Sequence, residues 1–187
     1  MRTPPLTLAL ILLVVLAPEA GGTKLKPAIK PKPVRAALER RYAELRSAYF
    51  RRDSSAILSS RLPQMFSITA SGDTLDPDAV RRYTRASFEQ VERTVALDWD
   101  LGVIDVQGDT AAVELDQHWA RRQLKGGVLR TIDTRAHQRE TWIRKQRRWF
   151  LWRVDHVQPG VWRVDGKGVD PSKPYDPNAP EYRPPGR

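Results

Sequence analysis

Apolar residues recur at helical spacing early in the chain. Four of them share one face of a predicted helix, at steps of four, three and four: Leu38, Tyr42, Leu45 and Tyr49. Asp53 then offers a capping carboxylate to a short second helix, "SSAILSSRL". Pro63 is predicted to end that helix and to lead into a strand, "QMFSITASG".

A third helix is predicted after the tripeptide Asp76-Pro77-Asp78. These residues provide a capping carboxylate, a proline at the first helical position and an acid in the first turn. The apolar stripe of this helix is Val80, Tyr83, Ser87, Phe88 and Val91.

From Thr94 onward the apolar period changes to two, which is typical of strands. The alternation shifts phase near Ile104, which indicates a bulge. Gly108-Asp109 and Gly126-Gly127 are predicted turns. Strands are therefore expected from about Thr110 to Arg122, from about Val128 to Arg144, and from Trp149 to Val157.

These elements predict an α+β fold in which three N-terminal helices pack on a curved antiparallel sheet, as in a cystatin-like cone. The domain is expected to cover residues 34–157. A Lys/Pro-rich, extended linker (residues 23–33) precedes it, and an irregular Pro/Gly-rich tail (residues 158–187) follows it.

Turns at Gly126-Gly127 and Gln146-Arg147 fix a predicted register for the last three long strands. Cross-strand pairs expected from it are Glu114 with Arg139, Asp116 with His137, His118 with Arg135, Glu140 with Arg153, and His137 with His156. One face is then apolar with a few polar groups, which is typical of a cavity lining: Val113, Leu115, Gln117, Trp119, Gln138, Glu140, Trp142, Leu151, Arg153 and Asp155. The other face is ion-paired, and its apolar end consists of Ile143, Phe150, Trp152 and Val154.

The charge balance favours acidic partners. Lys and Arg number 32 against 22 Asp and Glu, a net charge of +10. A solvated, arginine-rich surface explains the same balance without any partner. The chain has no cysteine and three histidines, so disulfides, thiolate catalysis and a dedicated metal site are not expected, nor is any cofactor.

The first 22 residues have the pattern of an export signal. Arg2 precedes an apolar run from Leu6 to Leu16, and Ala20 and Gly22 suit cleavage after Gly22. The run is shorter than the ~20 residues that span a bilayer. We therefore expect a secreted or periplasmic mature protein without a membrane span.

The segment "RETWIRKQRRWFLWRVDHV" combines aromatic and basic residues, as nucleic-acid-binding surfaces do. A base-stacking platform needs both kinds of residue on one open face. The predicted register divides the tryptophans between two faces, so nucleic acid is not the favoured partner.

Three stretches resemble the nuclear transport factor 2-like superfamily, which includes SnoaL-like cyclases, ketosteroid isomerase and limonene epoxide hydrolase. They are "YAELRSAYFRRDSSAILSSRLPQMFSI", "GDTAAVELDQ" and "ETWIRKQRRWFLWRVDHV", within residues 34–157. The resemblance implies a cone-shaped fold. It implies little about chemistry, because members range from enzymes to binding domains.

The resemblance transfers only part of the isomerase's catalytic set. The position of the proton-shuttling aspartate falls at Thr69, and that of the catalytic tyrosine falls near Leu45. The carboxylic acid that holds the oxyanion aligns with Glu140. Glu140, Arg153 and Asp155 also resemble the epoxide hydrolase's Asp-Arg-Asp group.

Glu140, Arg153 and Asp155 are accordingly the candidate catalytic residues. An internal ion pair that orients the sheet is the structural alternative for the same residues. The candidate ligand-binding residues are Leu115, Gln117, Trp119, Gln138, Trp142, Tyr49 and Tyr83. His137 and His156 are too few to hold a metal.

The function that the sequence favours is an exported domain that binds a small apolar or anionic ligand inside the cone, without assured catalysis. One alternative is a hydrolase or isomerase/cyclase that uses Glu140 as acid or base. The other is an envelope interaction module that uses its basic linker and surface. The patch of Ile143, Phe150, Trp152 and Val154 is expected to form a homodimer interface or to be covered by the tail.

Overall fold

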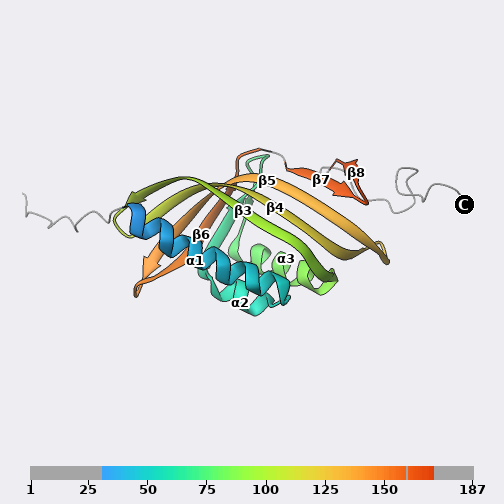
Figure 1. Ribbon diagram of the computed structural model, residues 1–187, viewed down its shortest axis with the longest axis horizontal. Coiled ribbons are helices and arrows are strands. Elements are labelled where there is room, and N and C mark those ends of the chain that lie inside the picture. Colours follow the sequence, from blue (N-terminus) through green and yellow to red (C-terminus); the bar gives the residue numbers. More distant parts are fainter. Residues whose placement is uncertain (1–30, 159, 171–187) are drawn as a thin grey trace, which may run out of the picture.

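The computed structural model describes residues 31–158 and 160–170 (Figure 1). The predicted export signal and residues 23–30 of the predicted linker lie outside the described residues. The helices are α1 (Pro31–Phe50), α2 (Ser54–Ser59) and α3 (Pro77–Gln90). The strands are β1 (Arg61–Ile68), β2 (Thr74–Leu75), β3 (Val91–Gln107), β4 (Thr110–Lys125), β5 (Val128–Lys145), β6 (Arg148–His156), β7 (Val161–Val164) and β8 (Lys167–Val169).

Helices begin where the sequence supplies suitable first-turn residues. An Asp53 carboxylate oxygen accepts a hydrogen bond from the Ala56 amide (2.8 Å), and Asp76 does the same for Ala79 (2.7 Å). Both predicted caps are confirmed. α1 begins at Pro31, inside the segment predicted to be an extended linker. Proline fits a first helical turn because the amides there have no intrahelical partner.

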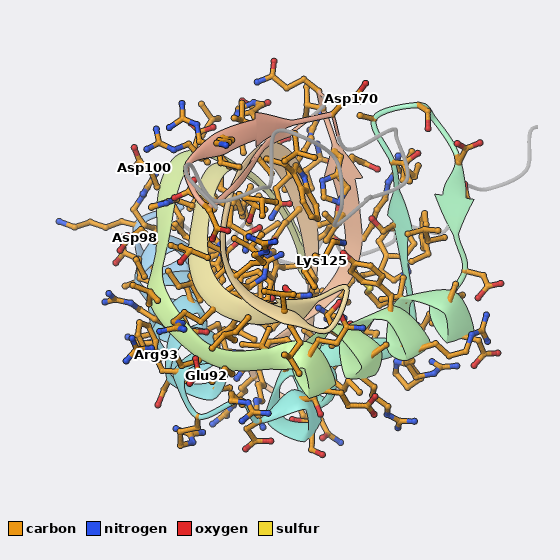
Figure 2. All side chains as sticks on the ribbon, turned by 90° about the vertical axis from the view of Figure 1, so that its right-hand side faces the viewer. Glu92, Arg93, Asp98, Asp100, Lys125 and Asp170 are labelled. Carbon is orange, nitrogen blue, oxygen red and sulfur yellow. The ribbon has the colours of Figure 1, made fainter. Side chains whose placement is uncertain are left out.

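The strands form a single eight-stranded sheet in the described part of the chain, in the order β2-β1-β6-β5-β4-β3, with β7 beside β5 and β8 beside β7. β1 and β6 run parallel, and the long strands β3 to β6 pair antiparallel. The sheet arches over α1 and α3 (Figure 1). Seen along the arch, its strands curl around a space filled by side chains (Figure 2). The predicted α+β cone is confirmed, with a concave face toward the helices and an outer face away from them.

The predicted β4–β5 register is confirmed along the whole pair. Glu114 stands opposite Arg139, Asp116 opposite His137, and His118 opposite Arg135. The expected bulge in β3 is present as well. Leu101 pairs with Leu115 and Ile104 with Val113, which leaves two β3 residues opposite Glu114.

The predicted β5–β6 register is correct near the turn and wrong beyond it. Trp142 pairs with Leu151 as expected, but Thr141 pairs with Arg153, so Trp152 is an extra residue in a bulge. A single inserted residue exchanges the faces of everything that follows. Val154 therefore pairs with Glu140 on the concave face.

Arg153 and Asp155 consequently lie on the outer face, not beside Glu140. Arg153 Nε donates to an Asp155 carboxylate oxygen at 2.7 Å, and the Arg153 guanidinium lies 5.6 Å from the Phe66 ring centroid. The predicted cluster of Glu140, Arg153 and Asp155 is thus wrong. His156 also moves to the face opposite His137, because it pairs with Gln138.

The segment after Val157 is more regular than the sequence analysis expected. β7 pairs with β5 (Thr134 opposite Trp162), and β8 pairs with β7, so residues 161–169 form a hairpin on the sheet. Its two-residue turn is Asp165-Gly166, and both residues have positive φ (49° and 81°). An Asp-Gly turn suits this conformation, which is the favoured one for hairpins. We call residues 161–169 the C-terminal hairpin.

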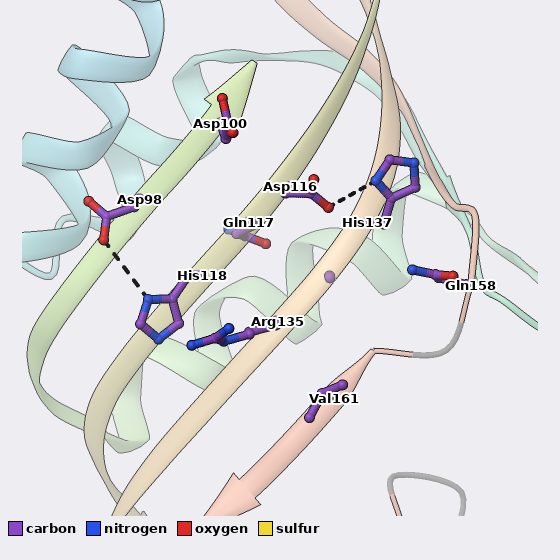
Figure 3. A pocket seen from close by; sticks show the side chains of 10 residues that line it. Asp98, Asp100, Asp116, Gln117, His118, Arg135, His137, Gln158 and Val161 are labelled. Atoms are coloured by element: carbon purple, nitrogen blue, oxygen red, sulfur yellow. Dashed lines mark hydrogen bonds and ion pairs between the residues drawn. The ribbon is translucent and has the colours of Figure 1, made fainter. Parts of the chain in front are cut away.

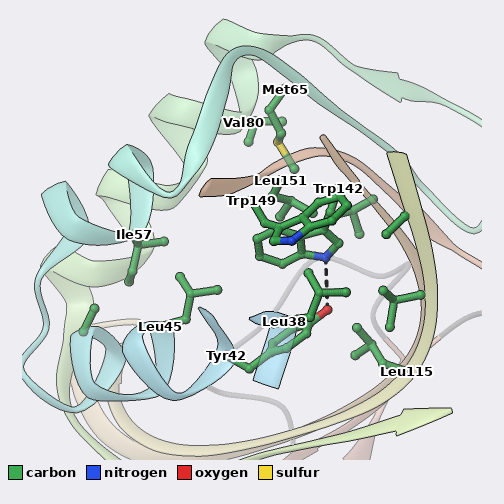
Figure 4. Close-up of a cluster of buried hydrophobic side chains, with 14 of the residues drawn as sticks. Leu38, Tyr42, Leu45, Ile57, Met65, Val80, Leu115, Trp142, Trp149 and Leu151 are labelled. Carbon is green, nitrogen blue, oxygen red and sulfur yellow. Dashed lines mark hydrogen bonds between the residues drawn. The ribbon is translucent and has the colours of Figure 1, made fainter. Parts of the chain in front are cut away.

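The core lies between the helices and the concave face (Figure 4). Its buried members include Leu38, Tyr42, Leu45, Ile57, Met65, Val80, Phe88, Val113, Leu115, Trp142, Trp149, Leu151 and Val154. A second, smaller cluster joins Ile132 of β5 to Val164 of the C-terminal hairpin. Among the helices of the described residues, none has the length and apolar character needed to cross a membrane.

Candidate functional site

Exposure changes along the concave face of β4 and β5. At one end the inward side chains are buried: Ala111, Val113, Leu115, Gln138, Glu140 and Trp142. Farther along the same strands four of them are half-buried (Gln117, Trp119, Thr134 and Ala136), and beyond these Arg121, Gln123 and Ile132 are buried again. Each end holds a polar group. The Glu140 cluster (Tyr42, Gln138, Glu140, Trp142) occupies one end, and the Arg121 cluster (Trp119, Arg121, Gln123, Thr134, Trp162) occupies the other.

In the Glu140 cluster both carboxylate oxygens are paired. One carboxylate oxygen of Glu140 accepts hydrogen bonds from the Tyr42 hydroxyl (2.6 Å) and the Trp142 indole (3.0 Å). The other accepts from the Gln138 amide at 3.1 Å. The Trp142 indole also donates to the Tyr42 oxygen at 3.2 Å, a contact drawn in Figure 4. Three donors from α1 and β5 thus hold one carboxyl group.

Burial raises the pKa of Glu140 above its ordinary value of 4.5. The hydrogen bonds from Tyr42 and Trp142 and the charge of Arg61 oppose that rise. Burial likewise raises the pKa of Tyr42, and Glu140 adds to the effect. The side chain of Glu140 is only 5% exposed, so this carboxyl is enclosed.

A run of aromatic rings leads from the Glu140 cluster toward the Arg121 cluster. Tyr42 contacts Trp99, with ring centroids 5.4 Å apart, and Trp99 contacts Tyr49 at 5.8 Å. Tyr49 then meets Trp119 at 5.1 Å, and Phe88 stacks on Trp119 at 5.7 Å. The wall between the two polar groups is therefore aromatic.

Arg121 is a buried cation inside the Arg121 cluster. It is 5% exposed, and its guanidinium carbon lies 3.9 Å from the centroid of the Trp119 ring and 5.8 Å from that of Trp162. Its Nε donates to the Gln123 side-chain oxygen at 2.8 Å, and its Nη1 donates to the Thr134 hydroxyl at 3.2 Å. All its polar contacts are thus to neutral groups.

The charge of Arg121 has no close counter-charge. Within residues 31–158 and 160–170, no carboxylate oxygen comes within the 4.0 Å of an ion pair. Burial lowers the pKa of Arg121 to about 10, while Tyr83, Tyr49 and Asp133 act in the opposite direction. The Asp133 carboxylate itself contacts His118 at 2.8 Å. Arg121 therefore stays charged at neutral pH.

Tyr49 lies between the two clusters. Its hydroxyl has no hydrogen-bond partner in the part of the chain that the structure describes, although its ring is packed on Phe88, Trp99 and Trp119. Burial raises its pKa, and the charges of Arg61, Glu140 and Arg121 also act on it. Arg61, whose Nη1 donates to the Thr84 hydroxyl at 2.7 Å, adds a second positive charge near the site.

A scan of the sequence against protein-family models gives no match, and a search of curated proteins gives none either. Similar solved structures exist. A candidate dehydratase of the NTF2-like family from Streptomyces avermitilis is 17% identical, with 67% of this chain and 96% of that chain covered and a TM-score of 0.52. The chain has the nuclear transport factor 2-like fold.

Two further structures with this fold bear different names. A candidate aromatic ring hydroxylase from Novosphingobium aromaticivorans is 16% identical over 73% of this chain and 96% of its own, with a TM-score of 0.56. A candidate calmodulin-dependent kinase II association domain from Exiguobacterium sibiricum is 14% identical over 77% and 99%, with a TM-score of 0.53. The expected resemblance is confirmed for the fold, and function has to be argued from the site.

Most predicted site residues lie on the concave face of this nuclear transport factor 2-like fold. Five come from β4 and β5 in the expected register: Leu115, Gln117, Trp119, Gln138 and Trp142. Tyr49 joins them from α1. Tyr83 projects from α3 with 62% of its surface exposed, so it is at most a rim residue. Because Thr84 is the buried residue at that level of α3, the helix turns Tyr83 toward solvent.

Sequence reasoning missed Arg121. The alternation of β4 that places Leu115, Gln117 and Trp119 on the concave face also places Arg121 there. Because an arginine near a strand end is usually solvated, Arg121 was not considered as a buried residue. Extending the alternation of β4 by one step beyond Trp119 would have predicted Arg121 on the concave face.

A hollow lies on the outer face, as Figure 3 shows. It measures about 430 Å³ and is lined by Asp98, Asp100, Asp116, Gln117, His118, Arg135, Ala136, His137, Gln158 and Val161. Four of its ionisable groups already have partners: His137 contacts Asp116 at 2.9 Å, and His118 contacts Asp98 at 3.9 Å and Asp133, outside the lining, at 2.8 Å. A smaller hollow of about 240 Å³ lies between α2, β1 and α3. Glu140 and Arg121 line neither of them.

Metal binding has no geometric basis in the residues that the structure describes. No group of three or more His, Cys, Asp or Glu side chains among them is placed to hold an ion. His137 and His156 lie on opposite faces, so they form no pair.

Proposed function

We propose that the protein binds a small anionic ligand on the concave face, anchored by Arg121. The supporting observation is the buried guanidinium that contacts only neutral groups and indole rings. Taking a charge out of water costs several kcal/mol unless a partner compensates it. A cation–π contact with Trp119 supplies about 2 kcal/mol. An anionic ligand would supply the missing counter-charge.

The surroundings of Arg121 favour a small organic anion. Half-buried aromatic rings flank the guanidinium, and the unpaired Tyr49 hydroxyl lies on the route toward Glu140. Ligand sites typically combine apolar walls with a few convergent polar groups. The positive charges of Arg61 and Arg121 outnumber the single carboxyl of Glu140 on this face.

Catalysis by Glu140 has less support. Its two oxygens already receive three hydrogen bonds from the protein, and the side chain is enclosed. Arg153 and Asp155, the other members of the predicted catalytic set, lie on the outer face. In our proposal the Glu140 cluster stabilises the cone and the Arg121 cluster binds the ligand.

Binding is tested with anilinonaphthalene sulfonate, a fluorescent aromatic anion, and the purified full-length protein. We expect saturable fluorescence with the wild type and about a tenfold or larger rise in Kd for Arg121→Gln, equivalent to the loss of roughly 1.4 kcal/mol. Arg139→Gln is the matched control, because Arg139 is an exposed arginine on the outer face of β5. Equal Kd values for wild type and Arg121→Gln would refute the proposal.

Export belongs to the same proposal. The support is the sequence of residues 1–22, with its apolar run and small residues before the expected cleavage point. N-terminal sequencing of the protein recovered outside the cytoplasm should find Thr23 as the first residue. Recovery with residues 1–22 intact would contradict cleavage.

We also propose the predicted homodimer, with an interface patch that no longer includes Val154. Ile143, Phe150 and Trp152 remain half-buried on the outer face, whereas Val154 points inward. Phe66 packs on Trp152 at 5.7 Å, so part of the patch is covered within the chain. Sedimentation of wild type against Trp152→Glu tests it: a monomer in both cases would exclude a dimer through this face.

A further inference from the structure

We infer that the ligand is a flat carboxylate with an aromatic ring, and that the C-terminal hairpin supplies one wall of its site. This inference rests on the proposed function, because it specifies the ligand of the same Arg121 cluster. Three features carry it: the free edge of the guanidinium, the two indole rings near it, and the attachment of the hairpin to β5.

The guanidinium has one edge free for a ligand. Its Nε and one N–H of Nη1 are used by Gln123 and Thr134. Nη2 has no partner within the described ranges, and Nη1 keeps a second N–H. Two parallel N–H groups on one edge match the two oxygens of a carboxylate in the same plane.

The indole rings favour a flat ligand over a bulky one. The guanidinium carbon lies 3.9 Å from the Trp119 ring centroid, which is stacking distance. A carboxylate bonded in the guanidinium plane runs along the same indole face, and an aromatic ring conjugated to it stays in that plane. A sulfonate or phosphate places an oxygen out of the plane, toward an indole.

Aromatic neighbours extend the surface beyond Trp119. Tyr49 and Phe88 pack on Trp119 at 5.1 and 5.7 Å between ring centroids. An apolar ring attached to the anion would find these faces within reach. Offset-stacked and edge-to-face aromatic pairs add about 0.5–1.5 kcal/mol beyond the area they bury.

The C-terminal hairpin is built into this site. The backbone pair of Thr134 and Trp162 places the hydroxyl that accepts from Arg121 beside the second indole. Ile132 and Val164 bury each other under the hairpin, each 2% exposed. Asp165 links the hairpin turn to β5. Its carboxylate accepts a hydrogen bond from the Thr131 amide and forms an ion pair with Arg130, both at 2.9 Å. Trp162 is thus held as a fixed wall.

Four small probes separate the features of the ligand when titrated by calorimetry into the full-length protein. Benzoate has the flat ring and the planar anion. Benzamide removes the charge, benzenesulfonate makes the head group tetrahedral, and cyclohexanecarboxylate removes the flat ring. We expect benzoate to bind about tenfold more tightly than each of the others, a difference of roughly 1.4 kcal/mol.

The role of the hairpin is tested with Trp162→Leu and a matched control, Trp152→Leu, which removes an indole from the outer face of β6. We expect about a tenfold rise in the benzoate Kd for Trp162→Leu, as for loss of a cation–π and stacking partner. Trp152→Leu should leave that Kd unchanged. If Trp162→Leu does not fold, Trp162→Phe, whose smaller ring attracts a cation more weakly, should raise the benzoate Kd by about threefold, and an unchanged Kd would contradict the role of the hairpin.

The outcomes distinguish this inference from the function on which it rests. If no probe binds in an Arg121-dependent way, the proposed function fails. If the sulfonate dye binds through Arg121 but benzamide or benzenesulfonate binds as tightly as benzoate, only the ligand class is overturned. If Trp162→Leu folds and binds benzoate like the wild type, the hairpin has no part in the site.

Discussion

The two polar clusters on the concave face differ in whether the chain itself compensates their ionisable group. This difference separates a structural cluster from a ligand-binding one. Glu140 is a buried acid whose oxygens receive three hydrogen bonds from side chains of the same chain. Arg121 is an equally buried base whose contacts leave its charge without a counter-ion. A closed hydrogen-bond network stabilises the fold, whereas an uncompensated charge is a cost that a ligand can offset.

From the sequence, Glu140 is the candidate acid or base of the alternative, catalytic function, because it aligns with the oxyanion-holding acid of the isomerase. In the structure, the charged group without a counter-charge is Arg121 instead. Burial of an ionisable group is common to both clusters, so burial alone does not indicate a binding site. Which donors and acceptors remain unpaired is the more useful observation.

The largest expected effect is the loss of stability in Glu140→Ala. Removing the carboxyl leaves the Tyr42 hydroxyl and the Gln138 amide without their acceptor, and it leaves the Trp142 indole with the Tyr42 oxygen alone. Each buried unpaired group costs about 1–3 kcal/mol, so we expect a loss of about 3 kcal/mol or more in the free energy of unfolding. Urea denaturation measures it, with Glu114→Ala on the exposed outer face as the control. A loss under 1 kcal/mol would mean that the network contributes little.

A matched pair of tyrosines sharpens the comparison. Tyr42→Phe removes a hydroxyl that donates to Glu140 and accepts from Trp142. Tyr49→Phe removes one with no partner in the described structure. We expect a loss of about 1–2 kcal/mol for the first and under about 0.5 kcal/mol for the second, by chemical denaturation. Equal losses would contradict the division into a structural and a ligand-binding cluster.

The fold was predictable where the pattern was periodic and the turns were marked. Gly126-Gly127 and the regular alternation of β4 specify one β4–β5 register, and the structure has it. In β6 the run "WFLWRV" offers apolar residues in both phases, and neither glycine nor proline marks the bulge at Trp152. The face of Arg153 and Asp155 therefore could not be read from the pattern.

The candidate site was only half predictable for a related reason. Periodicity shows which side of a strand a residue occupies, so Trp119 and Gln138 were placed correctly. It does not show whether a charge finds a partner in space, which is the property that distinguishes Arg121. The C-terminal hairpin carried a readable signal, since Asp165-Gly166 lies between alternating residues. The high proline content after it outweighed that signal.

The contribution of Glu140 to the free energy of unfolding depends on pH. The pKa of Glu140 is raised in the folded state, chiefly by burial, so the folded protein holds this proton more tightly than the unfolded chain. The resulting stability is fully present below the ordinary carboxyl pKa of 4.5 and is lost as the pH rises through the folded pKa. The unfolding free energy of wild type minus that of Glu140→Gln should therefore fall as the pH increases above that value, by up to about 1.4 kcal/mol per unit. A difference that is constant or rises with pH would show that the carboxylate form is the one the network stabilises.

The smallest expected effect on stability is that of Arg121→Gln, and its sign is the informative part. Glutamine keeps a side-chain amide that can donate to Gln123, and it removes the cost of burying a charge. It also loses the contact with Trp119, worth about 2 kcal/mol when desolvated, which offsets part of that gain. We expect the Tm without ligand to change little or to rise, while benzoate binding is lost. A fall in Tm comparable to that of Tyr42→Phe would instead make Arg121 a structural residue, because a group retained for its ligand should not be needed to hold the unliganded fold together.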